Sequence, residues 1–310
     1  MSQQDLIVVG VDGTHAGETA LRYAAREADR RGLGVRLVHV TPDLTHLVGS
    51  YAMALQVAPD DTQEMGRRIV ESAAELARDL LGPDRVTVAV MTGNRVASLV
   101  DAAEGAALTV LGDEPRPALD RLVTGSVLTG VAARSTGPVV AVPDDWSPET
   151  EHGTVVVAIK DVDGSGGLVR LGLEAAAARG ARLVVLHAWR LPVAYDDLIA
   201  SRLDTEMWGG EISRLLERVV DEQRAAGPQV EVDVRVGHGQ PAQLLVEASR
   251  EADLILIARR ARWFPIGHLG GTGRTVLRAS LCPVEVQPPP KDEGPAAPGT
   301  SAVQQTTASA

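Results

Sequence analysis

Residues 108–127 read LTVLGDEPRPALDRLVTGSV, and this stretch predicts both the fold and a candidate site. Leu108 to Leu111 form a short apolar run, typical of a strand buried in a parallel sheet. Gly112 ends the run, a polar loop with prolines follows, and Gly125-Ser126 opens a helical pattern. This order directs backbone amides at an anion. The simpler interpretation is that Gly112 only ends a strand and Ser126 only caps a helix, so the rest of the chain must decide.

The alternation of strand and helix patterns around this stretch occurs twice. In the first copy we expect strands over 6–11, 35–40, 86–91, 108–111 and 138–142, with helices over 18–31, 63–81, 96–107 and 126–134. In the second copy we expect strands over 154–159, 182–187, 230–236, 254–258 and 284–286. His187 and Gly180 follow His39 and Gly32 at one common offset, which indicates an internal repeat.

The repeat predicts an α/β protein of two tandem, doubly wound, Rossmann-like parallel-sheet domains with five strands each. We expect domains over 1–143 and 153–287, a linker over 144–152 and a disordered tail over 288–310. Ligands of such folds bind at the carboxyl ends of the strands. Asp12, Val40 and Gly112 are all predicted at such ends, which favours a binding site over the simpler interpretation.

The chain has 310 residues, a formal net charge of −11 and a single cysteine, Cys282. The acidic balance argues against a general surface for nucleic acid or acidic membranes. One cysteine excludes an internal disulfide and a multi-cysteine metal site. The N-terminal stretch MSQQDLIVVGVDG lacks a signal-like apolar core, and no apolar run approaches the ~20 residues of a membrane helix. We therefore expect a cytoplasmic protein without nucleic-acid or membrane partners.

The chain resembles the universal stress protein family in its tandem two-domain form. The resemblance is carried by VVGVDGT at 8–14, LVHV at 37–40, the loop from 112 to 126, TGPVVAV at 136–142 and LCPVEV at 281–286. The family's loop has a glycine, two residues, a glycine, nine residues, a glycine and then Ser or Thr. Here the spacing is intact, but Pro115 stands at the second glycine.

The resemblance implies a stress-response regulatory protein that binds ATP or another adenine nucleotide, with or without Mg²⁺, in the first domain. Asp12 would meet the adenine or ribose, and the Val40 backbone would meet the adenine edge. Gly112 would let the chain approach the phosphates. The implied nucleotide-binding residues are Gly10, Val11, Asp12, Val40, Leu111, Gly112, Gly125, Ser126 and Val127.

The family's members dimerise through their last strands, so the resemblance implies that 139–142 and 284–286 pair as an intramolecular pseudo-dimer, with a homodimer left open. We predict no catalytic residue and no metal site, because no such grouping or metal-ligand spacing is present. His39 and His187 are interpreted as strand-end packing residues. An interaction module that binds no nucleotide and a slow ATPase are the alternative functions.

The second copy departs further from the family pattern. Lys160 stands where the first copy has Asp12, and an ammonium group accepts no hydrogen bond from a ribose hydroxyl. Ala258 and Ala261 replace the two loop glycines. Either Gly271-Thr272 or Gly270-Gly271 then corresponds to Gly125-Ser126. The second copy is therefore predicted to be degenerate as an adenine site.

Replacing Pro115 by glycine should strengthen ATP binding, because proline lacks the N–H that the family's glycine offers. One amide-to-phosphate bond is worth about 1.5–3 kcal/mol, or roughly one to two powers of ten in affinity. Calorimetric titration of both proteins with ATP checks this. Equal affinity would mean that the proline does not limit binding.

Overall fold

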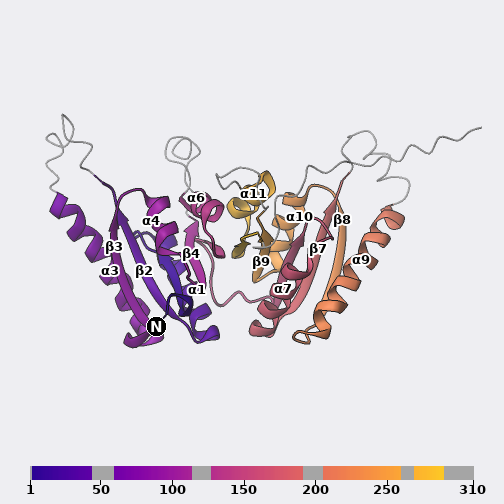
Figure 1. Ribbon diagram of the computed structural model, residues 1–310, viewed down its shortest axis with the longest axis horizontal. Coiled ribbons are helices and arrows are strands. Elements are labelled where there is room, and N and C mark those ends of the chain that lie inside the picture. The colour runs from indigo at the N-terminus through magenta and orange to yellow at the C-terminus, as the bar shows by residue number, and fades with distance from the viewer. Residues whose placement is uncertain (1, 44–58, 114–126, 191–204, 260–268, 290–310) are drawn as a thin grey trace, which may run out of the picture.

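The computed structural model describes residues 2–43, 59–113, 127–190, 205–259 and 269–289 (Figure 1). The first half of the chain contains β1 (Leu6–Gly10), α1 (His15–Arg31), β2 (Gly34–Thr41), α3 (Pro59–Leu81), β3 (Val86–Thr92), α4 (Arg95–Ala102), β4 (Leu108–Asp113), α6 (Val127–Arg134) and β5 (Val139–Pro143). The second half contains β6 (Thr154–Ile159), α7 (Gly166–Arg179), β7 (Arg182–Trp189), α9 (Thr205–Ala225), β8 (Val232–His238), α10 (Pro241–Ala248), β9 (Leu254–Ala258), α11 (Gly271–Ala279) and β10 (Val284–Gln287). Short 3₁₀ turns lie at Gln3–Asp5, Pro83–Arg85 and Ser249–Glu251.

The two halves have glycines with positive φ at equivalent positions. Gly32 and Gly180 end α1 and α7 in the left-handed conformation, with φ of 67° and 62°. Gly93 and Gly239 follow the third strand of each half with φ of 136° and 144°, values that favour glycine. The predicted repeat is therefore present in the backbone as well as in the sequence.

Some predicted helix ends differ from the structure. The first helix begins at His15 rather than at 18, because the Thr14 hydroxyl accepts a hydrogen bond from the Gly17 N–H and caps it. The helix predicted over 96–107 ends at Ala102, shortly before Gly105 turns the chain with φ of 75°. The segment 144–152, predicted as a linker, has no described helix or strand. Residues 290–310 of the predicted tail lie outside the described residues.

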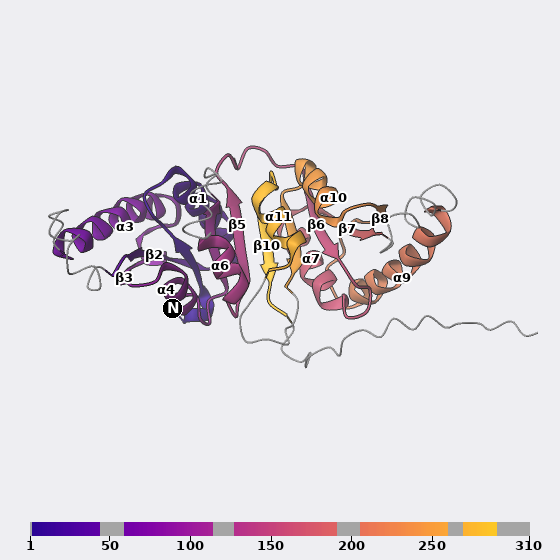
Figure 2. The same ribbon diagram turned by 90° about the horizontal axis from the view of Figure 1, so that it is seen from above.

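The described strands form one continuous sheet in the order β3-β2-β1-β4-β5-β10-β9-β6-β7-β8. Each half contributes five parallel strands, as predicted, and their order is equivalent in the two halves. The halves join through antiparallel pairing of β5 with β10, which places Val139 beside Val286 and Val140 beside Glu285 (Figure 2). The two predicted sheets are thus one sheet, and the implied pairing of the last strands is present.

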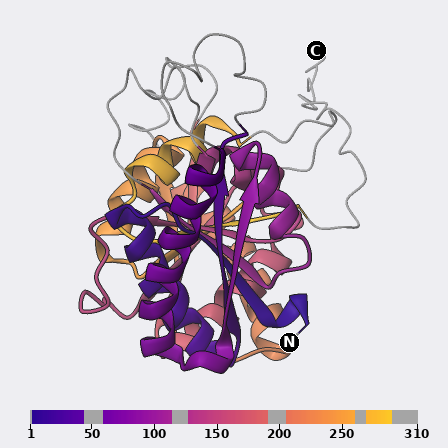
Figure 3. The ribbon, with the colours of Figure 1, turned by 90° about the vertical axis from the view of Figure 1, so that its left-hand side faces the viewer.

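Helices cover both faces of the sheet, and the two faces join the halves in different ways (Figure 3). On one face, side chains of α4, α6, α10 and α11 form one apolar core that runs across both halves and includes Leu128, Val131, Val276 and Leu277. On the other face, α1 and α3 cover a core of the first half, and α7 and α9 cover a separate core of the second half.

A buried group of charges joins the halves between those two separate cores. The Arg179 guanidinium of α7 lies 2.6 Å from the Glu27 carboxylate of α1, and Glu27 is only 1% exposed. Arg30 and Arg31 also pair with Glu27, at 2.9 and 3.0 Å. Burial opposes ionisation of Glu27, but Arg179 and Arg31 outweigh it and hold its pKa below the ordinary value. Ionised Glu27 therefore binds the two halves together.

Glu285 of β10 lies at the edge of this group and is poorly satisfied. It is 4% exposed, and its Oε2 has no hydrogen-bond partner in the described part of the chain. The Arg31 guanidinium is 3.9 Å away. Burial raises the pKa of Glu285 despite the nearby arginines. The folded protein thus disfavours the ionised form of this side chain.

Replacing Glu285 by glutamine should stabilise the protein at pH 7 by roughly 1 kcal/mol, because the neutral amide avoids burying an ionised carboxylate that has an unsatisfied oxygen. A carboxyl group with a raised folded pKa contributes stability below its ordinary pKa of 4.5 and loses it as pH rises through the raised value. The gain should therefore shrink as pH falls towards 4.5. Denaturant unfolding of wild type and Glu285→Gln between pH 4 and 8 measures it. The exposed residue Glu247 of α10 supplies the control Glu247→Gln, and equal behaviour of both variants would contradict the assignment.

Candidate functional site

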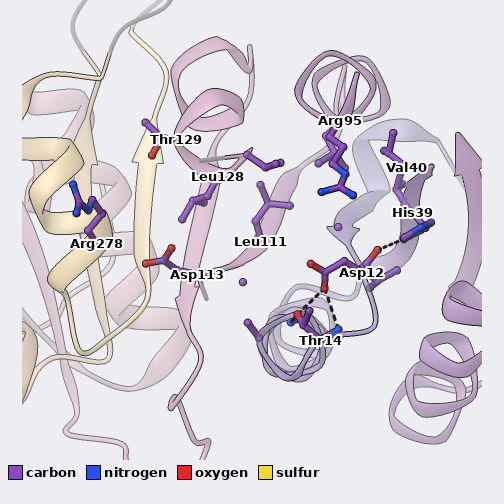
Figure 4. Close-up of a pocket in the computed structure, with 18 of the residues that line it drawn as sticks. Asp12, Thr14, His39, Val40, Arg95, Leu111, Asp113, Leu128, Thr129 and Arg278 are labelled. Carbon is purple, nitrogen blue, oxygen red and sulfur yellow. Dashed lines mark hydrogen bonds between the residues drawn. The ribbon is translucent and has the colours of Figure 1, made fainter. Parts of the chain in front are cut away.

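A cavity of about 850 Å³ lies at the carboxyl ends of β1, β2 and β4 (Figure 4). Its volume falls within the range of small-molecule sites in proteins. Predicted site residues from four separate segments line it, namely Gly10, Val11, Asp12, Val40, Leu111, Gly112 and Val127. The predicted residues Gly125 and Ser126, and Pro115 between the same elements, lie outside the described residues.

The Asp12 carboxylate is held at the rim of the cavity by the turn that follows β1. Its Oδ1 accepts hydrogen bonds from the Thr14 N–H at 3.1 Å and the Thr14 hydroxyl at 2.6 Å. A Cβ on Gly17 would lie 2.9 Å from the same oxygen, so glycine there leaves room for the carboxylate. Asp12 itself is exposed. It can therefore accept hydrogen bonds from a ligand without moving.

His39 lines the cavity, and its ring position is fixed by a backbone bond. Its Nδ1 lies 2.7 Å from the Val11 carbonyl oxygen, so Nδ1 must carry the hydrogen and donate it. His187 makes the same bond to Ile159 in the second half, at 3.0 Å. Burial lowers the pKa of His187 and favours its neutral form. The repeated bond supports the predicted strand-end role of both histidines.

Gly112 has a packing reason to be glycine. A Cβ built there would lie 2.3 Å from the carbonyl oxygen of Ala16 and 2.5 Å from its carbonyl carbon, in the first turn of α1. The missing side chain therefore lets β4 approach α1, and this contact is needed with or without a ligand. The implied role in admitting phosphates is an additional one.

The cavity also has lining residues that sequence reasoning did not single out. Arg95 reaches in from the start of α4, and Arg278 faces the cavity from α11 of the second half (Figure 4). These residues include Thr14, Gly17, Arg95 and Thr129 from the first half, and Arg274, Thr275 and Arg278 from the second. His39 and Gly271, which the sequence had already drawn attention to, line the cavity as well. Gly271, Arg274, Thr275 and Arg278 are spaced at helical positions i, i+3, i+4 and i+7, which was a readable signal of one helix face. The sequence could not say that this face meets the other half.

The second half lacks the counterparts of Asp12 and Ser126, two of the residues predicted to bind nucleotide in the first half. Lys160 replaces Asp12 and pairs with Asp161 at 2.9 Å. The bonds that end α6 and α11, from Ser135 N–H to the Val131 oxygen and from Ser280 N–H to the Val276 oxygen, are equivalent. This alignment places Gly271 at the position of Ser126, so the second half has no hydroxyl there.

Among the residues that the structure describes, no group of three or more His, Cys, Asp or Glu side chains is arranged to hold a metal ion. In the same ranges, no helix combines the length and the apolar character needed to cross a membrane.

A family model described as Universal stress protein family matches residues 5–143 and again 152–288. The chain belongs to the universal stress protein family. A universal stress protein of Mycobacterium tuberculosis is 29% identical over 303 residues, covering 92% of this chain and 96% of that protein. One of Mycolicibacterium smegmatis is 29% identical over 292 residues, covering 91% and 97%. The fold is similar to the crystal structure of a universal stress protein from Archaeoglobus fulgidus, with 20% identity, a TM-score of 0.69 and coverage of 94% and 99%.

Replacing Gly112 by alanine should lower the free energy of unfolding by about 1–3 kcal/mol, because the added methyl group meets the Ala16 backbone. Gly210 of α9 is the matched control, since a Cβ there meets nothing within 4 Å. Gly210→Ala should be neutral or stabilising by up to about 1 kcal/mol. Thermal unfolding without ligand compares the two. A Gly112→Ala variant as stable as wild type would refute the packing role.

Proposed function

We propose that the first domain of this universal stress protein binds ATP or another adenine nucleotide, and that a protein partner reads the bound state. The observation that carries the proposal is the convergence of seven implied residues, from four segments, on one cavity of suitable volume. The proposed role is regulatory, in the cytoplasm, and it requires no chemical step.

The adenosine end would lie between β1 and β2. Val38 accepts a hydrogen bond on its β1 side from the Val11 N–H. Backbone groups alternate along a parallel strand, so the Val40 N–H and C=O point to that same side, beyond the end of β1. An adenine edge needs one donor and one acceptor of this kind. The exposed Asp12 carboxylate, 2 residues beyond Gly10, is then placed to accept ribose hydroxyls.

The phosphate end would lie at the start of α6. Val127 lines the cavity as the first residue of that helix, where unpaired amides and the helix dipole favour an anion. Arg95 supplies a positive charge from the facing helix α4. The Asp113 carboxylate also lines the cavity and would repel phosphate, and the positive charge of Arg95 would offset this repulsion. Mg²⁺, if bound, would come with the nucleotide and be held chiefly by its phosphates.

ATP should raise the melting temperature of the wild type, because a ligand that binds only the folded state stabilises it. Replacing Asp12 by alanine should weaken ATP binding roughly tenfold through loss of charge-assisted hydrogen bonds. Asp161→Ala is the matched control, since Asp161 lies at the equivalent strand end of the second domain.

Thermal shift and calorimetric titration with ATP and AMP measure both effects. No stabilisation of the wild type at millimolar nucleotide would refute the proposal and favour an interaction module. Phosphate release that falls in Asp12→Ala would instead favour the ATPase alternative.

A further inference from the structure

We infer that the second domain completes the site of the first, with Arg274 and Arg278 of α11 binding the terminal phosphates of a nucleoside triphosphate. The inference rests on the proposed function and names a composite site within it. The second domain would then contribute positively charged side chains to the nucleotide site of the first domain, and would bind no nucleotide itself.

The geometry of α11 supports this role. Gly271, Arg274, Thr275 and Arg278 all line the first domain's cavity, and their spacing places them on one face of the helix. Val276 and Leu277 lie on the opposite face of α11 and are buried in the core that the two domains share. Burial of that opposite face fixes which side of α11 meets the cavity.

The charges on this face are available to a ligand. Arg274 and Arg278 are both exposed, and neither guanidinium makes an ion pair within the part of the chain that the structure describes. By contrast, Arg179 is paired with Glu27 and Arg170 with Glu174. Two exposed guanidinium groups that line a cavity suit a polyphosphate, which accepts bidentate hydrogen bonds.

The arginines are present on only one side of the pseudo-dimer. The alignment of α6 with α11 places Thr129 at the position of Arg274 and Ala133 at that of Arg278. The first domain therefore presents uncharged residues where the second presents cations. This asymmetry matches the asymmetry of the sites, since Asp12 is kept in the first domain and Lys160 replaces it in the second.

The second domain also holds α6, the helix whose first turn is proposed to bind the phosphates. Arg259, just after β9, donates hydrogen bonds to the carbonyl oxygens of Ala132 at 3.0 Å and Ser135 at 2.8 Å, at the end of α6. Cations at a helix C-terminus stabilise it. Because β5 and β10 also pair, α6 and α11 are held at a set distance, and the arginines need no domain movement to reach the cavity.

Asp113 and Arg278 both line the cavity, and Figure 4 draws Arg278 on the same side as Asp113, the acid that would repel phosphate. Charges from α11 would offset that of Asp113, with the largest effect on the β- and γ-phosphates that extend away from the adenosine end. The expected signature is a selective effect on nucleotides with more phosphates.

The test is calorimetric titration of the full-length protein with ATP, ADP and AMP. The double variant Arg274→Gln/Arg278→Gln should bind ATP roughly tenfold to a hundredfold more weakly, with AMP binding changed less than twofold. Arg214→Gln/Arg218→Gln on exposed positions of α9 removes the same charge from the same domain and should change neither. Melting temperatures without ligand should match in all three proteins.

The outcomes separate the two ideas. A wild type that binds no nucleotide would overturn the proposed function and this inference with it. If wild type binds ATP and the Arg274/Arg278 double variant binds it equally tightly, the inference alone is overturned. Equal losses for ATP and AMP would also overturn it, because they would indicate a general charge effect instead of contact with the terminal phosphates.

Discussion

The antiparallel pairing of β5 with β10 is the interaction on which the rest of the structure depends. It turns two five-stranded sheets into one and brings the helices of both halves side by side. On one face the join is apolar and continuous, through α6 and α11. On the other face it is ionic, through Glu27 and Arg179. Burial of apolar surface is the main driving force for such a join, whereas a buried ion pair must offset the cost of removing its charges from water.

The cavity follows from this arrangement and from parallel topology. Parallel strands end at a common edge, so Asp12, Val40 and Gly112 meet there although they are far apart in sequence. Gly112 shows that a residue of this motif can be required by packing alone, because the space next to its Cα is taken by Ala16. A glycine in a binding motif is therefore a weaker indication of ligand contact than its motif position suggests.

Most of the fold could be predicted from the sequence because its cause is local. Apolar runs, helical spacing and glycine stops recur in the same order in both halves, and the structure follows them except at ends set by single contacts such as the Thr14 cap. The part of the cavity within one half was also predictable, since strand ends meet by topology. The position of Arg274 and Arg278 beside that cavity was not, because it depends on how two units lie against each other. Glu27 and Arg179 were missed for the same reason, as their pairing joins residues of different repeats.

The register of β5 and β10 has a consequence for how this protein could have arisen. Glu285 lies directly beside Val140, its own counterpart in the other repeat. In an association of two identical single-unit chains, any acid at this position would face its own copy, and two buried carboxylates side by side repel. Fusion of two units into one polypeptide removes that constraint, because a substitution then falls on one side only. Covalent linkage thus permits the central β5–β10 pair to carry an acid on one strand and valine on the other.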